Sequence, residues 1–252
     1  NGIARTFGGR TWAFQHASLT RSPLDNALVL ASALQPIAGQ PLTLLSQSRG
    51  GMVVELLALA AELTESDVRE WRGRSVLRSP TDDEVEKLQH LRVQARALNI
   101  HRVVRVAAPI TGTSLLAENL DAWLNVGLNG LGFLLSAATA APWVKPVYGV
   151  FKDFALGAVG ARFDRESLPG LEAMIPGSPL SLLLGAGKRG RGELVAIAGD
   201  ARRPGFWGRI KHVIPRAFFR GANDLVVDTA AMGVGERLGD KQIVWHRQSR
   251  KG

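Results

Sequence analysis

The stretch from residue 41 to residue 63, PLTLLSQSRGGMVVELLALAAEL, constrains the fold more than any other part of the sequence. Residues 41–46 form an apolar run of the length and kind expected for a strand that is buried on both faces of a parallel sheet. Residues 50–63 follow with apolar side chains at helical spacing. Only a short turn containing serines, Arg49 and glycine joins the two segments. A buried strand that leads directly into an apolar helix predicts an α/β fold.

Further segments alternate in the same way along the chain. Residues 10–16 read as a short strand, and residues 22–34 read as a helix with Ser22 at its N-cap and Pro23 at its first position. A charged stretch with helical character, 64–99, leads to another strand. The later strands are expected at 101–109, 193–200, 223–229 and 241–246. This alternation favours right-handed crossovers and a mostly parallel sheet flanked by helices.

The regular alternation is interrupted between residues 114 and 188. This segment is rich in Leu, Ala, Trp and Phe at helical spacing, so we expect a helical insertion over one end of the sheet. Residues 122–144 approach the length of a membrane span, but they contain Asn125 and Asn129 together with glycine and proline. We therefore interpret them as a buried or lid-forming helix. The 252 residues fit a single domain spanning 1–252.

Composition excludes several kinds of chemistry. The sequence contains no cysteine, which removes disulfides and thiolate sites for metals, and we expect neither a metal nor a cofactor. The net charge of +9 favours contact with anionic surfaces such as lipid headgroups. The sequence carries no nucleic-acid-binding motif, and the turn at 48–51 lacks the glycine pattern of a dinucleotide site. Residues 1–20 show no signal peptide, so a cytoplasmic location is expected.

Ser48 is the candidate nucleophile. A serine on a strained turn between a buried strand and a helix exposes its hydroxyl at the edge of the sheet, and small residues two before and two after it let the two backbones pass closely. Ser46 and Gly50 occupy those positions, in the pattern S-x-S-x-G. The backbone N–H of Arg49, at the start of the helix, is the expected oxyanion donor.

A nucleophilic serine needs a base and an orienting acid, in the chain order serine, acid, histidine for this architecture. His246 follows every candidate acid and comes directly after an apolar strand. Asp224 is the favoured acid, because a Gly-Ala-Asn loop delivers it just ahead of an apolar run. Asp200, at the end of the strand predicted at 193–200, is the alternative.

Five segments in order, LLSQSRGG, RVVRVAAPITGTSL, LPGLEAMIPGSPL, AIAGD and NDLVVDTAAM, resemble bacterial α/β-hydrolases of the lipase-like or esterase-like kind. Some members of that family accompany caspase-like (CHAT) domains, which implies fusion or association with other domains. The resemblance implies an α/β-hydrolase fold with Ser48 as nucleophile and Asp224 as acid. Members usually begin with a strand and a His-Gly oxyanion loop, which we expect to lie outside this sequence.

The resulting hypothesis is a serine hydrolase that cleaves carboxylic esters through an acyl-enzyme. Apolar side chains of the insertion, among them Trp123, Leu124 and Phe133, could line an acyl pocket or form a mobile lid. Together with the positive charge, they favour a lipid or phospholipid ester as substrate. The alternative is a catalytically inactive binding or scaffold module with the same fold.

Overall fold

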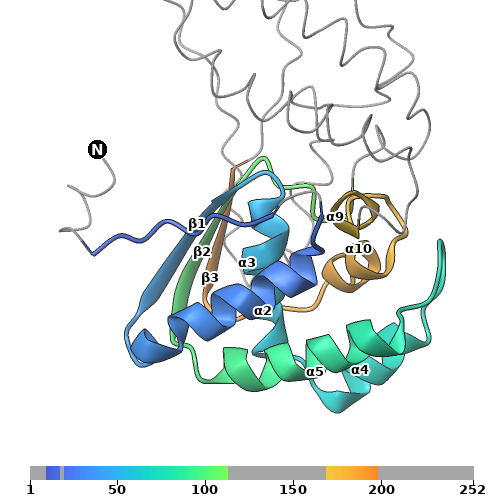
Figure 1. Cartoon of the computed structure of the whole chain (residues 1–252), viewed down its shortest axis with the longest axis horizontal. Helices are drawn as coiled ribbons and strands as arrows, with labels where there is room; N and C mark the ends of the chain where they lie inside the picture. Colours follow the sequence, from blue (N-terminus) through green and yellow to red (C-terminus); the bar gives the residue numbers. More distant parts are fainter. Residues whose placement is uncertain (1–9, 18–19, 113–168, 198–252) are drawn as a thin grey trace, which may run out of the picture.

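A computed structural model describes residues 10–17, 20–112 and 169–197 of the chain. Its centre is a parallel sheet of strands β1 (Leu42–Gln47), β2 (Ile100–Val106) and β3 (Glu193–Ile197), in the order β1-β2-β3 (Figure 1). Helices separate the strands along the chain, as the crossovers between parallel strands require. The described residues therefore form a parallel sheet flanked by helices, and the expectation of an α/β fold is confirmed for them.

The three strands end level with one another. Gln47 pairs with Val106, and Val106 pairs in turn with Ile197. Because the strands are parallel, their carboxyl ends meet at the same edge of the sheet, which is where α/β proteins place their ligands. The turns that follow these strands are the first place to look for a site.

The described helices are α2 (Pro23–Leu34), the 3-10 helix η1 (Gln35–Ile37), α3 (Gly50–Ala60), α4 (Glu65–Arg72), α5 (Asp82–Arg96), α9 (Pro169–Glu172) and α10 (Pro179–Leu184). The charged stretch predicted at 64–99 thus consists of two helices, α4 and α5. Capping boxes begin α2, α4 and α5, because Ser22, Thr64 and Thr81 each exchange hydrogen bonds with an acid three residues later. The prediction of Ser22 as an N-cap is confirmed.

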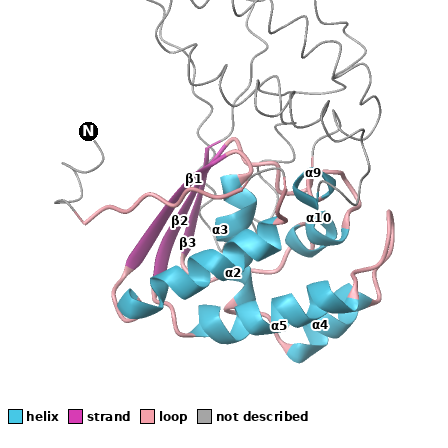
Figure 2. Ribbon diagram, in the orientation of Figure 1, coloured by secondary structure: helices cyan, strands magenta, loops and turns pink. Residues whose placement is uncertain are grey.

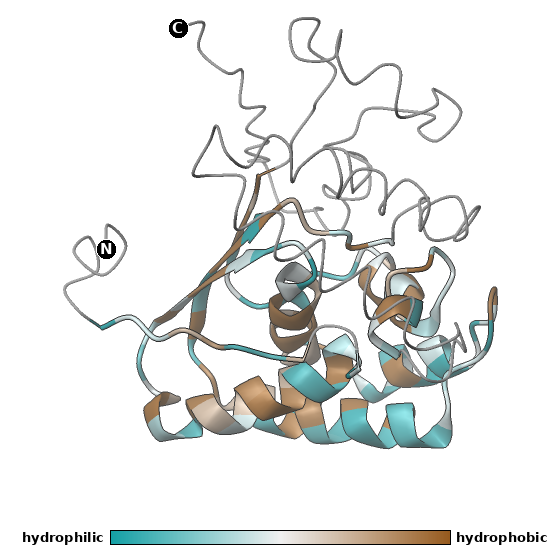
Figure 3. Cartoon of the chain, turned by 45° about the horizontal axis from the view of Figure 1, so that its top comes forward, coloured by the Kyte–Doolittle hydropathy of each residue, from teal (hydrophilic) through white to brown (hydrophobic). Residues whose placement is uncertain are grey.

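Helix α3 forms the centre of the core. All its residues from Gly51 to Ala60 are buried, and the helix packs between the strands on one side and α2 and α5 on the other (Figure 2). Figure 3 shows mainly hydrophobic colour on this central helix, whereas the outer helices carry hydrophobic and hydrophilic residues together. An apolar helix in such a position can be hydrophobic all round, which explains why its sequence has little polar surface.

Strand β1 differs from the prediction of burial on both faces. Leu42 is buried, but Thr43, Leu45 and Gln47 are exposed, and Leu45 keeps 53% of its side-chain surface in contact with solvent. The reason is that the described helices all lie on the same side of the sheet (Figure 2). Among these residues, the other face of β1 has no layer of helices against it.

The strand predicted at 10–16 is absent from the sheet. Residues 10–17 run irregularly, without ladder hydrogen bonds to any described strand. Phe14 packs against the core and stacks on His16, whereas Trp12 is 66% exposed. Asn26 holds the end of this segment, because its Nδ2 donates to the carbonyl of Ala17 at 3.0 Å. The alternating pattern here reflects one-sided packing and not strand pairing.

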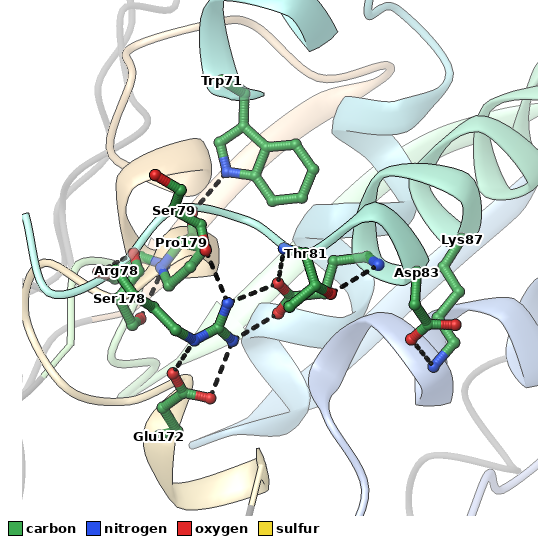
Figure 4. A network of polar contacts seen from close by, with 11 residues as sticks. Trp71, Arg78, Ser79, Thr81, Asp83, Lys87, Glu172, Ser178 and Pro179 are labelled. Carbon is green, nitrogen blue, oxygen red and sulfur yellow. Dashed lines mark hydrogen bonds and ion pairs between the residues drawn. The ribbon is translucent and has the colours of Figure 1, made fainter. Parts of the chain in front are cut away.

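The end of the predicted insertion contains α9 and α10, which pack against the first half of the chain. Trp71 of α4 is buried, and its indole Nε1 donates to the carbonyl of Pro179 at 2.7 Å (Figure 4). Residues 113–168 lie outside the described ranges, and with them the segment 122–144. Within the part of the chain that is described, no helix is long and apolar enough to cross a membrane.

Arg78 joins three separate parts of this layer. Its guanidinium donates to both carboxylate oxygens of Glu84, at 2.7 and 2.8 Å, and to both oxygens of Glu172 (Figure 4). Glu84 belongs to the capping box of α5, and Glu172 belongs to α9. The side chains of both carboxylates are mostly buried, with 16% and 14% exposed. Arg78 therefore ties the loop after α4 to α5 and to α9.

Replacing Arg78 with methionine is expected to lower the free energy of unfolding by about 2 kcal/mol, because two mostly buried carboxylates lose their counter-charge while some water can still reach them. Urea unfolding measures this change. The matched control is Arg72→Met, which removes an exposed pair with Asp82 and should have little effect. Equal losses in the two variants would contradict the special role of Arg78.

The same contact has a pH signature. Burial alone would raise the pKa of Glu84, but hydrogen bonds from Arg78 and Thr81 outweigh it and leave that pKa lowered. A carboxyl whose pKa is lowered by folding contributes stability above its unfolded value, and this contribution is lost as the pH falls through the folded pKa. The difference in stability between the wild type and Arg78→Met should therefore shrink as the pH falls below 4.5, which is the ordinary pKa of a glutamate side chain.

Candidate active site

Ser48 occupies the turn directly after β1, at the carboxyl edge of the sheet. Its φ is +51°, in the left-handed region that residues other than glycine seldom adopt. Its N–H donates to the carbonyl of Val106 at 2.8 Å, and its own carbonyl accepts from the N–H of Gly51 at 2.9 Å. These bonds fix the turn between the end of β2 and the start of α3. A strained backbone held in this way is characteristic of functional sites.

At Gly51, helix α3 packs tightly against the segment that follows β2. A Cβ atom on Gly51 would lie 2.2 Å from the Cβ of Ala108, far inside van der Waals contact. At Gly50 an added Cβ would be 3.8 Å from the nearest atoms, those of His16 and Ser46, which is an ordinary contact. The close approach therefore requires glycine at position 51, whereas the S-x-S-x-G pattern had indicated Gly50.

Two N–H groups at the start of α3, those of the N-cap residue Arg49 and of Gly50, are available as donors among the described residues. The N–H groups of Gly51 and Met52 donate to the carbonyls of Ser48 and Arg49. Those of Arg49 and Gly50 have no acceptor among the described residues. Unpaired N–H groups at the start of a helix, beside a partly buried serine, can bind a negatively charged oxygen.

The side chain of Arg49 is buried against the same turn, with 5% of its surface exposed. One of its nitrogens, Nη2, donates to the carbonyl of Arg21, while Nε and Nη1 have no partner among the described residues. Burial lowers the pKa of Arg49 to about 10, so the guanidinium remains charged at neutral pH. Within 4.0 Å of it, the described part of the chain supplies no carboxylate.

His16 is a neighbour of the turn that the sequence did not identify. Its Cε1 lies 3.8 Å from the position of a Cβ on Gly50. Burial and the charge of Arg49 lower the pKa of His16, against a hydrogen bond with the backbone of Phe14 that raises it. His16 precedes Ser48 in the chain, and the expected order of serine, acid and histidine had set it aside. No sequence signal indicates this proximity.

Beneath the turn lies a buried ion pair between β2 and α3. Nη1 of Arg105 is 3.3 Å from Oε2 of Glu55, and both side chains are almost fully buried. Arg105 also lies opposite Ser46 in the register of the sheet, and its Cγ is 3.8 Å from the position of a Cβ on Gly51. The pair therefore supports the elements on both sides of Ser48.

The remaining predicted site residues lie outside the described ranges: Asp200, Asp224, His246, Trp123, Leu124 and Phe133. Of the predicted site, the structure describes Ser48 and Arg49 together with the small residues around them. Strand β3 ends at the same edge of the sheet as Ser48, shortly before Asp200. In the ranges 10–17, 20–112 and 169–197, no group of acids and histidines is arranged to hold a metal.

A small pocket lies between α4 and α10, lined by Trp71 and Lys188 among others. It holds about 10 Å³, which is room for a single water molecule. It is too small to bind an ester.

These observations define an α/β protein with a serine in a strained strand–turn–helix at the carboxyl edge of a parallel sheet. Residues 71–248 match the model of a family described as a domain of unknown function (DUF7379), and the chain belongs to that family. The matched residues include Asp200, Asp224 and His246, and they begin after Ser48.

Two further comparisons were made with known proteins. The chain is similar to the structure of lipase 1 from Pelosinus fermentans, with 11% identity and a TM-score of 0.47 over 93% of this chain and 76% of that chain. Among curated proteins, no sequence matches.

Proposed function

We infer that the protein is a serine hydrolase that cleaves carboxylic esters, with an α/β-hydrolase architecture and a lid formed by the insertion. The observation that carries this proposal is the turn at Ser48. Its positive φ, its position between β1 and α3 and the unpaired N–H groups after it are the features that an activated serine needs.

In the proposed reaction, Ser48 Oγ attacks the carbonyl carbon of the ester and its proton passes to His246. Asp224 holds the imidazole of His246 in the required tautomer. The N–H of Arg49 stabilises the developing oxyanion, and such a donor contributes on the order of 3 kcal/mol. The alcohol leaves with the proton from His246, and water then hydrolyses the acyl-enzyme.

Asp200 is the alternative acid. It follows β3, and the carboxyl end of β3 is level with Ser48 in the sheet. This place in the sequence, shortly after the end of β3, supports keeping Asp200 beside Asp224 in any test.

The substrate is proposed to be an ester with an apolar acyl chain, including lipid esters, with Trp123, Leu124 and Phe133 along that chain. The net charge of +9 supports contact with an anionic membrane surface. Esters of increasing acyl length test this part, because an apolar pocket predicts activity that is retained or rises beyond short chains.

The direct test is covalent labelling with a fluorophosphonate probe, which reacts with activated serines. We expect the wild-type protein to be labelled and Ser48→Ala to remain unlabelled. Ser46→Ala is the matched control, since Ser46 Oγ donates to the carbonyl of Val104 at 3.1 Å and has no proposed part in the chemistry. A wild-type protein that resists the probe would contradict the proposal.

Further variants assign the partners of Ser48. Labelling should fall by several orders of magnitude in His246→Ala, and a comparison of Asp224→Asn with Asp200→Asn identifies the acid. Labelling that persists in His246→Ala would move the base to another residue.

A further inference from the structure

The side chain of Arg49 has no role in the proposed ester hydrolase mechanism. The mechanism uses only its backbone N–H, yet the side chain is a buried cation with Nε and Nη1 unpaired among the described residues. Buried polar groups nearly always have partners, and an unpaired buried charge is costly. A bound anion or a water molecule would supply the missing hydrogen-bond partner of this guanidinium.

Further hydrogen-bond donors lie near this side chain, and among the described residues no carboxylate lies within 4.0 Å of its guanidinium. The N–H groups of Arg49 and Gly50 point from the start of α3 without an acceptor among the described residues. The imidazole of His16 lies against Gly50, and its lowered pKa keeps it neutral near pH 7. The positive end of the helix dipole is directed to the same place. The guanidinium, the two N–H groups and the start of the helix all attract negative charge.

Resting on the proposed function, we propose that the Arg49 guanidinium and the start of α3 bind an anionic group of the ester substrate, a carboxylate or a phosphate. The substrate class is thus an ester that carries a negative charge close to its reacting carbonyl. Because the guanidinium is shielded from water, the attraction is stronger than on an exposed surface.

Binding of the anion is tested first, without any reaction. The probes are inorganic phosphate and acetate, each compared with chloride at equal ionic strength, and the readout is thermal unfolding of the full chain. At about ten times Kd, either bound anion shifts the unfolding equilibrium about tenfold toward the folded state. The shift is expected in the wild type and in Ser48→Ala, and it is expected to disappear in Arg49→Gln.

Two variants keep the result interpretable. Arg49→Lys retains the charge and should retain part of the shift, which guards against misreading a folding defect in Arg49→Gln. Arg69→Gln removes a charge from an exposed position of α4 and should leave the shift unchanged. The relative effects of phosphate and acetate identify which kind of anion the site prefers. No shift with either anion in the wild type would overturn the proposal.

The second readout is the preference between esters. The ratio of kcat/KM for a carboxylate-bearing nitrophenyl ester to that for a neutral one of equal length should fall tenfold to roughly a hundredfold in Arg49→Gln, the worth of a hydrogen bond to a charged group. An unchanged ratio would overturn the proposal. An anion shift without fluorophosphonate labelling would leave the site standing and reject the hydrolase. Fluorophosphonate labelling without an anion-induced shift would support the hydrolase and reject the anion site.

Discussion

Gly51→Ala is expected to destabilise the protein by about 3 kcal/mol and to suppress labelling of Ser48, because its new methyl group would enter the volume of the Ala108 methyl group. The carbon atoms would be 2.2 Å apart, so helix α3 and the segment that follows β2 must separate. That movement also displaces Ser48, whose carbonyl accepts from the N–H of Gly51. Urea unfolding and fluorophosphonate labelling measure the two effects.

The effect of Gly51→Ala can be tested for its cause. Adding Ala108→Gly removes the atom that clashes and leaves contacts of 3.5 Å or more, so the double variant should recover most of the lost stability. The two substitutions should show a coupling energy of about 2 kcal/mol in a double-mutant cycle. Gly50→Ala is the matched control and should change stability by less than about 1 kcal/mol, since its nearest contacts are at 3.8 Å. Additive effects at Gly51 and Ala108 would refute the clash.

Trp71→Ala is expected to cost about 4 kcal/mol of stability, because the indole is almost fully buried between α4 and α10 and its removal leaves a cavity. The carbonyl of Pro179 also loses its hydrogen bond at 2.7 Å. Trp71→Phe should cost less, since it keeps most of the apolar surface and loses mainly that bond.

Trp12→Ala provides the comparison for Trp71, since it makes the same substitution at a position that is 66% exposed. It should leave the urea midpoint almost unchanged. If Trp71→Ala were as mild as Trp12→Ala, the contact between α4 and α10 would contribute little to stability. A large loss would show that α10 is held to the first half of the chain through this residue.

The local structure was largely predictable from the sequence. The capping box at Ser22 and the apolar run at 50–63 predicted α2 and α3, because both signals act within a few residues. The strand after Gln40 was predicted for the same reason. The strand at 10–16 was predicted wrongly, since alternation indicates which side chains are buried and does not provide a pairing partner.

The site was only partly predictable. The position of Ser48 between a strand and a helix identified it as the candidate nucleophile, but its positive φ and the donors beside it are properties of the folded chain. The pattern favoured Gly50 as the position that must stay small, whereas the packing of Ala108 makes Gly51 that position. His16 was set aside on chain order, which carries no information about distance.

By itself, the sequence determined where α2, α3 and the three described strands begin, because propensity, capping and periodicity act over neighbouring residues. Only the tertiary structure decided which residues meet: His16 beside Gly50, Arg105 paired with Glu55 beneath the turn, and Arg49 buried without a counter-charge among the described residues. These contacts join segments far apart in the chain, and burial and the exclusion of water give them their energies. Neither the distances nor the burial can be read from the order of residues.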